Sequence, residues 1–480
     1  MAARSVADVV VDELVNAGVA RVFTAGPASC LGPLAVAARA RGLVFVETAA
    51  SATAAMMAAV TGELGEAPGV LALSPTDVVG AFGGLSYAGA ARASLVLISS
   101  SVLKGVSAPL KGTVRPTKES AGEAMSNALR LALDDPQGPV HLVLFPDLAA
   151  AEAATWTRGP AVGPGGPVAP PPAHLDEAAR ILAAAARPVL VIGLRCRKAA
   201  PWLRALAEAV PMPALATLKG KGVLPDPHPL MLGLLSAGDA LFARADLVVT
   251  VGLDPLEEMA ATWPPALPRL DLGASVDGAV ARVGVVPVPG DVALIIEELA
   301  PRLRDRPRAD WDVAELDRLK RVRPIGAPSR ELSPSRAVEV VRAVMPAGSI
   351  ATAEEGPYAA VVAAAWQAVG PNELLIGAGS PGQLFAPAAA LAAALARPRA
   401  RAVAFTDALG LAAAGDAVAT ARRLQVPVVL IGLGDTGQEA PPGAVALNDD
   451  ELARALHGAL AGRGPCIIQA PVRRERESPV

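Results

Sequence analysis

Glu47 is the residue of this sequence whose type and position best suit proton transfer. It directly follows the apolar run at residues 44–46 and precedes a stretch of small residues at 49–59. A carboxyl group in a mostly apolar setting has a raised pKa, which suits proton exchange near neutral pH. The alternative is a glutamate that is solvated at the end of a strand. We interpret Glu47 as a catalytic carboxyl group.

The segments that would position Glu47 alternate between strand-like and helix-like patterns. Residues 6–17 place Val and Leu side chains on one face of a helix. Unbroken apolar runs separated by helices are typical of parallel sheets that are covered on both faces. The sequence therefore predicts an α/β fold with mostly parallel sheets. The expected strands are 19–23, 70–73, 95–98, 140–144, 188–192, 247–251, 402–405 and 427–431.

Two segments interrupt the alternation and predict domain boundaries. The first is rich in Pro and Gly, which do not sustain a regular helix, and the second is a charged run that contains prolines. A chain of 480 residues is too long for one core, and its length indicates about three domains. We predict a first domain at 1–156, a linker at 157–172, a central domain at 173–305, a second linker at 306–332 with a helix at 309–321, a third domain at 333–474 and a tail at 475–480.

Composition excludes several classes of partner. The 43 basic and 46 acidic residues give a net charge of −3, which offers no electrostatic attraction for nucleic acid. Cys30, Cys196 and Cys466 are far apart, so a reduced compartment is expected and a structural zinc site is not. The N-terminus soon meets acidic residues, unlike a signal peptide, and the apolar run 387–396 is too short for a bilayer. We expect a soluble, cytoplasmic protein without nucleic-acid or membrane partners.

A series of motifs spans most of the chain in a consistent order. Glu47 is followed by a small-residue helix that ends in Thr61-Gly62. Further motifs lie at 138–142 with 146–147, 187–193, 217–225, 228–229, 232–233 and 245–248. Together they resemble the thiamine diphosphate (ThDP) enzymes of the acetolactate synthase type. The resemblance implies three consecutive doubly wound domains: a pyrimidine-binding domain, a central domain and a pyrophosphate-binding domain.

The resemblance also implies roles for acidic residues. Glu47 would promote the imino tautomer of the aminopyrimidine, and a divalent metal would anchor the diphosphate. The metal ligands would be Asp407, Asp435 and the carbonyl of Gly437, oxygen donors of the kind that Mg²⁺ prefers. Asp407 and Asp435 are 28 positions apart, which fits a strand–helix–strand crossover. The alternative is that both aspartates merely end strands.

Four further residues are expected to contact the cofactor. Ala408 and Leu409 follow the first aspartate of the metal motif. Ser380 and Gly382 lie in a glycine-rich loop that enters a helix, which is a suitable place for an anion.

The cofactor motifs depart from the family at several positions. Thr406 and Ala408 replace glycines that let the backbone approach diphosphate, and Asp435 replaces a neutral Asn. We interpret Glu354 and Glu355 as a solvated acidic turn. The altered motifs favour a competing hypothesis, in which the chain is a non-catalytic relative that serves as a binding or assembly protein.

The central domain of some relatives holds FAD. Here Gly193 and Gly252 stand alone after their strands, which is weak evidence for a nucleotide and is typical of tight turns. We interpret Lys219 and Lys221 as residues that shape a loop, so FAD is not expected.

The leading hypothesis is a divergent ThDP- and Mg²⁺-dependent enzyme that acts on a 2-oxo acid or an aldehyde. It would decarboxylate its substrate, or make or break a C–C bond beside a carbonyl group. The resemblance implies a homodimer or homotetramer with the cofactor site between subunits. The small-residue helix at 49–59 would then form a dimer surface, and packing within one chain explains it equally well.

Overall fold

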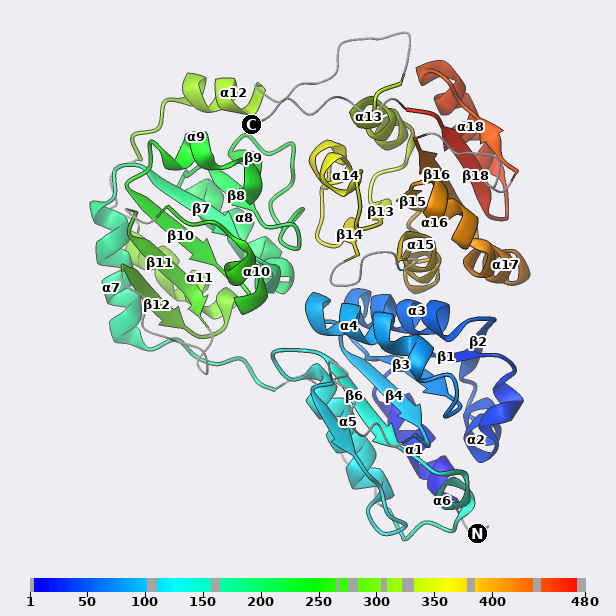
Figure 1. The fold of residues 1–480 in the computed structure, drawn as a ribbon. Coiled ribbons are helices and arrows are strands. Elements are labelled where there is room, and N and C mark those ends of the chain that lie inside the picture. Colours follow the sequence, from blue (N-terminus) through cyan, green and yellow to red (C-terminus); the bar gives the residue numbers. More distant parts are fainter. Residues whose placement is uncertain are drawn as a thin grey trace. The chain divides into compact units, whose positions relative to one another are not determined.

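The structure is a computed structural model in which most of the chain is described (Figure 1). It divides into two compact units: Met1–Gly165 with Ser349–Ala359 and Ile376–Val480, and Gly166–Gly348 with Ala360–Leu375. Within the described ranges, none of the helices is both long and apolar enough to cross a bilayer. The described residues are 4–101, 110–156, 165–264, 267–274, 284–303, 309–321, 332–377, 385–434 and 442–472.

In the described ranges the strands form three sheets of six, and every pairing between named strands is parallel. The first sheet has the order β2-β1-β3-β4-β6-β5. Its elements are α1 (Val6–Asn16), β1 (Arg21–Ala25), η1 (Ala28–Leu31), α2 (Pro33–Ala40), β2 (Val44–Thr48), α3 (Ser51–Leu64), β3 (Gly69–Leu73), η2 (Val79–Ala81), α4 (Phe82–Ala91), β4 (Leu95–Ser99), β5 (Gly112–Val114), α5 (Ala121–Leu133), β6 (Pro139–Val143) and α6 (Pro146–Ala150).

The last sheet repeats the topology of the first, with the order β14-β13-β15-β16-β18-β17. The similarity between the two sheets is therefore one of strand order. The elements are β13 (Ile350–Ala353), α14 (Ala359–Ala365), β14 (Leu374–Ile376), α15 (Phe385–Ala396), β15 (Ala402–Thr406), α16 (Ala408–Ala413), α17 (Gly415–Leu424), β16 (Val428–Leu433), β17 (Ala444–Val445), α18 (Asp449–Ala461) and β18 (Cys466–Ala470).

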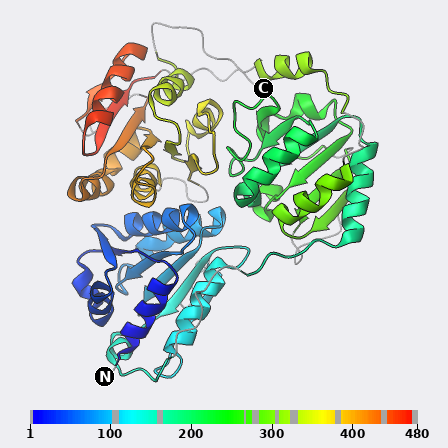
Figure 2. The same ribbon diagram turned by 180° about the vertical axis from the view of Figure 1, so that it is seen from behind.

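The central sheet has the order β12-β11-β10-β7-β8-β9, which is the strand order of dinucleotide-binding folds. Figures 1 and 2 show its helices on both faces from opposite sides. The elements are α7 (Pro172–Ala184), β7 (Pro188–Ile192), η3 (Leu194–Ala199), α8 (Ala200–Ala209), β8 (Ala214–Ala216), β9 (Met231–Leu234), η4 (Leu235–Ala237), α9 (Asp239–Phe242), β10 (Leu247–Val251), α10 (Pro255–Ala260), β11 (Arg269–Ala274), β12 (Val285–Pro289), α11 (Val292–Leu299), η5 (Ala300–Leu303), α12 (Val313–Arg321) and α13 (Pro334–Val344).

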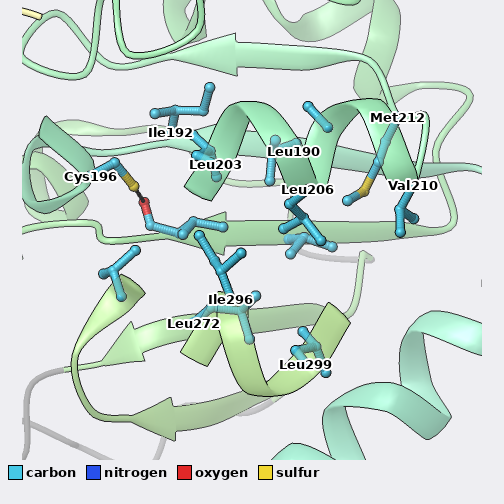
Figure 3. Packing of buried hydrophobic residues seen from close by; sticks show 14 of the residues in the cluster. Leu190, Ile192, Cys196, Leu203, Leu206, Val210, Met212, Leu272, Ile296 and Leu299 are labelled. Atoms are coloured by element: carbon cyan, nitrogen blue, oxygen red, sulfur yellow. Dashed lines mark hydrogen bonds between the residues drawn. The ribbon is translucent and has the colours of Figure 1, made fainter. Parts of the chain in front are cut away.

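The core of the central sheet is built from aliphatic side chains of strands and helices (Figure 3). Leu203 and Leu206 of α8 pack against strand residues, and Ile296 of α11 belongs to the same buried cluster. Cys196 is fully buried there and donates its thiol to the carbonyl of Val251 at 3.0 Å. Burial among apolar side chains raises the pKa of this thiol.

The small-residue helix α3 is covered within its own unit. It packs against both α4 and α15, and residues 53–60 are buried. Close packing is possible because α15 consists largely of alanine and α3 is rich in Ala, Ser, Thr and Gly, whose short side chains let helix axes approach. Of the two explanations that the sequence left open for this helix, packing within the chain accounts for these residues.

The predicted α/β class with mostly parallel sheets is confirmed. The expected strands 188–192 and 247–251 coincide with β7 and β10. The strand expected at 19–23 begins and ends two residues later, as β1. The helix expected at 309–321 begins at Val313, as α12.

Candidate functional site

Glu47 lies near the end of β2, the edge strand of the first sheet. Its Oε1 accepts a hydrogen bond from the backbone N–H of Ala28 at 2.8 Å. That N–H follows a turn in which Gly26 has a φ of +68°, a conformation that favours glycine. The structure therefore holds one carboxylate oxygen of Glu47 through the loop that follows the neighbouring strand.

The surroundings of Glu47 differ from the mostly apolar setting that we expected. Its side chain is 36% exposed, and the guanidinium Nη2 of Arg39 lies 4.0 Å from Oε1. The physical reason is that β2 is an edge strand that pairs with β1 alone, which leaves its other side without a neighbouring strand. The carboxylate is thus both held in place and open to a ligand.

The chain that follows Glu47 is held from a distant element, α17. Asp416 accepts hydrogen bonds from the backbone N–H groups of Ala49, at 2.8 Å, and Ala50, at 3.0 Å. Arg423 donates to the main-chain oxygen of Glu47 itself. These contacts join residues more than 360 positions apart, so sequence spacing carries no signal for them.

Asp407 directly follows β15 and caps α16. Its Oδ1 accepts a hydrogen bond from the N–H of Gly410 at 2.9 Å, and no described hydrogen bond uses Oδ2. Ala408 and Leu409 are the first two residues of that helix, and the Leu409 side chain is 80% exposed. Asp407 therefore does end a strand, as the alternative proposed, and one of its oxygens remains for a cation.

Thr406, one residue before Asp407, is buried at the end of β15. Its hydroxyl oxygen has no hydrogen-bond partner among the described residues. A Cβ placed on Gly410 would lie only 1.8 Å from that oxygen. The threonine side chain, at a position where the resemblance implies glycine, is therefore accommodated by a glycine in the next helix.

Glu354 follows β13 and is not part of the solvated turn that we expected. Its two carboxylate oxygens accept hydrogen bonds from the N–H groups of Phe385, at 3.1 Å, and Ala386, at 2.9 Å. Burial raises the pKa of Glu354 to about 7, and the negative charge of Asp407 contributes in the same direction. The next residue, Glu355, is exposed. The first N–H groups of α15 are therefore already paired with an internal carboxyl group.

Four of the predicted site residues, Ser380, Gly382, Asp435 and Gly437, lie outside the described residues. Within the ranges that are described, no group of three or more His, Cys, Asp or Glu side chains is placed to hold a metal ion.

The described residues nevertheless fit the two ends of a ThDP molecule in chemical type. Glu47 offers a fixed and accessible carboxyl group for an aminopyrimidine. Asp407 offers one carboxylate oxygen, and Mg²⁺ bound to a diphosphate commonly takes only one or two carboxylates, with phosphates and water completing its shell. The donor set thus suits the cofactor that the resemblance implies.

The turn after the first central strand is closed by Glu257. Its Oε2 accepts the N–H groups of Leu194, at 2.9 Å, and Asp254, at 3.0 Å, while Oε1 accepts the hydroxyl of Thr217 at 2.6 Å. Burial raises the pKa of Glu257. The backbone donors of this turn are therefore occupied by a side chain of the protein.

The two lysines of the loop at 217–225 have structural surroundings, as predicted. Lys221 forms a buried ion pair with Asp226 at 2.6 Å. Asp226 also accepts the N–H of Ala368 at 2.7 Å. Lys219 is buried, and its carbonyl oxygen accepts a hydrogen bond from Arg197.

Comparison with known proteins identifies sequences and structures that are similar to this chain. Residues 175–299 match the family model described as "Thiamine pyrophosphate enzyme, central domain". The chain is 29% identical over 329 residues to acetolactate synthase isozyme 1 large subunit of Escherichia coli (strain K12), covering 65% of this chain and 58% of that protein. It is 32% identical over 208 residues to the probable 2-ketoarginine decarboxylase AruI of Pseudomonas aeruginosa, covering 40% of this chain and 35% of that protein.

The chain thus spans between about a third and three fifths of the length of these curated relatives. Among solved structures, benzoylformate decarboxylase from Polynucleobacter necessarius aligns with a TM-score of 0.82 at 18% identity, covering 98% of this chain and 99% of that one. A putative thiamin diphosphate-dependent enzyme from Mycobacterium smegmatis aligns with a TM-score of 0.79 at 21% identity, covering 98% and 100%. At these identities the structural matches establish the fold.

Proposed function

This chain is related to the thiamine diphosphate enzymes of the acetolactate synthase type, and on that premise we propose that it is itself a divergent ThDP- and Mg²⁺-dependent enzyme. The observation that carries the proposal is the placement of Glu47. Its carboxylate is held by the N–H of Ala28 and remains 36% exposed at the end of a strand. A structural glutamate would be expected to use both oxygens within the fold, as Glu354 and Glu257 do.

The proposed mechanism assigns proton transfer to Glu47. ThDP, when bound, supplies a thiazolium carbon that becomes nucleophilic on deprotonation. The N–H of Ala28 fixes Oε1 of Glu47, so the carboxyl group is oriented before a ligand arrives, which lowers the cost of reaching a reactive geometry. Asp407 would hold Mg²⁺ through Oδ2, together with Asp435 and the carbonyl of Gly437. Ala408, Leu409, Ser380 and Gly382 would contact the cofactor.

The proposed substrate is a 2-oxo acid or a related aldehyde. 2-Ketoarginine and benzoylformate, which appear in the names of two similar proteins, are both 2-oxo acids. The reaction class is therefore decarboxylation, or formation or cleavage of a C–C bond beside the carbonyl group. We further propose a cytoplasmic homo-oligomer, a dimer or a tetramer, whose cofactor site lies between subunits. The three free thiols are in keeping with a reducing compartment.

Calorimetric titration of the purified protein with ThDP, with and without Mg²⁺, tests the proposal first. Metal-dependent binding is expected, and Asp407→Ala should abolish it. Absence of binding at high ThDP would overturn the proposal and leave the non-catalytic alternative.

Proton exchange at the thiazolium carbon of bound ThDP tests the role of Glu47. Glu47→Gln should slow this exchange by about 100-fold or more, the usual contribution of a positioned acid–base group. Glu63→Gln, which alters a buried glutamate of α3 that Tyr87 contacts, is a control for general disturbance of this domain. Exchange that is unchanged in folded Glu47→Gln would exclude Glu47 as the activating group.

A further inference from the structure

We propose that α17 positions Glu47, through Asp416 and Arg423, and that these are positioning residues for the reaction proposed above. The inference rests on the proposed function, because it concerns the geometry of the residue that would transfer the proton. The segment it concerns is Glu47–Ala50, which joins the end of β2 to the start of α3.

Asp416 uses both of its carboxylate oxygens on this segment. Oδ1 accepts the N–H of Ala49, and Oδ2 accepts the N–H of Ala50. Ala50 is the residue that precedes α3, and it has no side chain that could cap the helix. Asp416 therefore places a negative charge at this helix start, where the backbone dipoles favour it and the hydrogen bonds to an ionised group are strong.

Arg423 holds the other end of the same segment by donating to the main-chain oxygen of Glu47. Arg423 is seven positions after Asp416, two turns along one face of α17. Two side chains of α17 therefore hold three backbone groups of this segment: the carbonyl oxygen of Glu47 and the N–H groups of Ala49 and Ala50.

Neither residue contacts the Glu47 carboxylate in the described hydrogen bonds, so the proposed role is positional. Fixing the backbone on both sides of Glu47 limits the directions that its side chain can take. Small displacements of a catalytic group are costly, and an error of about 1 Å can lower a rate by about 100-fold. The Glu47 side chain has one backbone N–H bond of its own, so backbone placement decides where the remaining oxygen points.

The same helix also lies close in sequence to the proposed metal ligand. α16 begins directly after Asp407 and ends at Ala413, and α17 begins at Gly415. A short helical segment therefore leads from Asp407 to the residues that hold Glu47. On the proposed function, α17 is thus linked to both acidic groups, to Glu47 by hydrogen bonds and to Asp407 through the adjoining helix α16.

Amide hydrogen exchange of the cofactor-free protein tests the contact directly. In Asp416→Ala, the amides of Ala49 and Ala50 should exchange about tenfold faster or more, because two charge-assisted hydrogen bonds are lost. Asp416→Asn, which keeps one good acceptor, should show a smaller effect and serves if the alanine variant does not fold. Asp450→Ala removes an exposed first-turn acid from α18 and is the matched control. Unchanged exchange at Ala49 and Ala50 in a folded Asp416 variant would overturn the proposal.

Proton exchange at the thiazolium carbon separates positioning from general structure. Asp416→Ala and Arg423→Gln should each slow this exchange by about tenfold or more while ThDP affinity stays within about twofold of the parent. A parallel loss of affinity and exchange would show a merely structural role and would overturn the positioning assignment. If Glu47→Gln leaves thiazolium exchange unchanged, the proposed function fails instead, and the amide exchange of the cofactor-free protein still decides whether α17 holds the segment.

Discussion

The hydroxyl oxygen of Thr406 occupies the space that a side chain on Gly410 would need. A Cβ on Gly410 would lie 1.8 Å from Thr406 Oγ1 and 3.1 Å from Thr406 Cβ. The two residues therefore form a matched large–small pair across the turn from β15 to α16. This pairing explains how a threonine can replace a glycine beside Asp407 while its side chain remains buried.

Gly410→Ala should therefore lower the free energy of unfolding by about 1–3 kcal/mol, the usual cost of inserting a methyl group into a packed site. In the Thr406→Ala background the same substitution should cost less, because the conflicting oxygen is gone. Chemical denaturation of the single and double variants measures the coupling. Gly458→Ala in α18, where the new methyl group meets open space, is the control. Strictly additive costs would contradict the pairing.

We expect the buried His141 to make the folded protein less stable as the pH falls. It is buried in β6 with Nε2 2.8 Å from the Ser99 hydroxyl, and burial lowers its pKa to about 4 from the ordinary 6.5. Between these values the unfolded chain binds a proton that the folded protein does not, so stability falls as pH drops through this range. One pKa unit corresponds to about 1.4 kcal/mol, so the loss approaches roughly 3 kcal/mol.

Denaturation curves of the parent and His141→Gln between pH 7 and pH 4 test this effect. The glutamine variant should lose less stability over the range, because it does not titrate. His457→Gln, at an exposed position of α18, controls for the change of residue type. Equal slopes for the parent and His141→Gln would contradict the prediction.

We expect a single substitution in the Lys221–Asp226 ion pair to destabilise the protein more than a double substitution that removes both charges. Both side chains are at least nine-tenths buried, and Asp226 also accepts the N–H of Ala368. Lys221→Met should cost about 3–5 kcal/mol, because it leaves a buried carboxylate without its counter-charge. Lys221→Met combined with Asp226→Asn should cost less, since the charge is removed and an acceptor for Ala368 remains. A double variant that is no more stable than the single would argue against this explanation.

We predict from the hydrogen bonds of Glu257 that the central domain does not bind FAD. Its carboxylate already accepts the N–H groups of Leu194 and Asp254 at the turn where a nucleotide phosphate would require such donors. The purified protein should be colourless, and flavin titration should produce no change in its visible spectrum. A yellow protein, or saturable flavin binding by the parent, would contradict this prediction.

Much of the fold could be predicted because buried parallel strands are apolar along their whole length. The runs at 188–192 and 247–251 have no solvent-facing side, and they appear unchanged as β7 and β10. Short strands were not predictable in this way. β17 has two residues, and β5, β8 and β14 have three each, so their pairing depends on neighbouring strands rather than on a local pattern.

The candidate site likewise has a part that the sequence predicted and a part that it did not. Glu47 was predicted at a strand end because an apolar run stops there and a small-residue helix follows, and this information is local. Its contacts with Ala28 and Arg39, and the role of Glu354 at the start of α15, were not predicted. These contacts join separate elements, so no spacing in the sequence reveals them.

The α/β class, the long apolar strands such as β7 and β10, and the acidic residue near the end of β2 could be read from the sequence, because each depends on a local run of residues. Other properties depend on the tertiary structure. Glu47 is accessible and lies near the guanidinium of Arg39. The Thr406 side chain fits against Gly410, and α17 holds the segment Glu47–Ala50 by hydrogen bonds. Those properties depend on which distant backbone groups meet. Sheet order and helix packing alone bring them together.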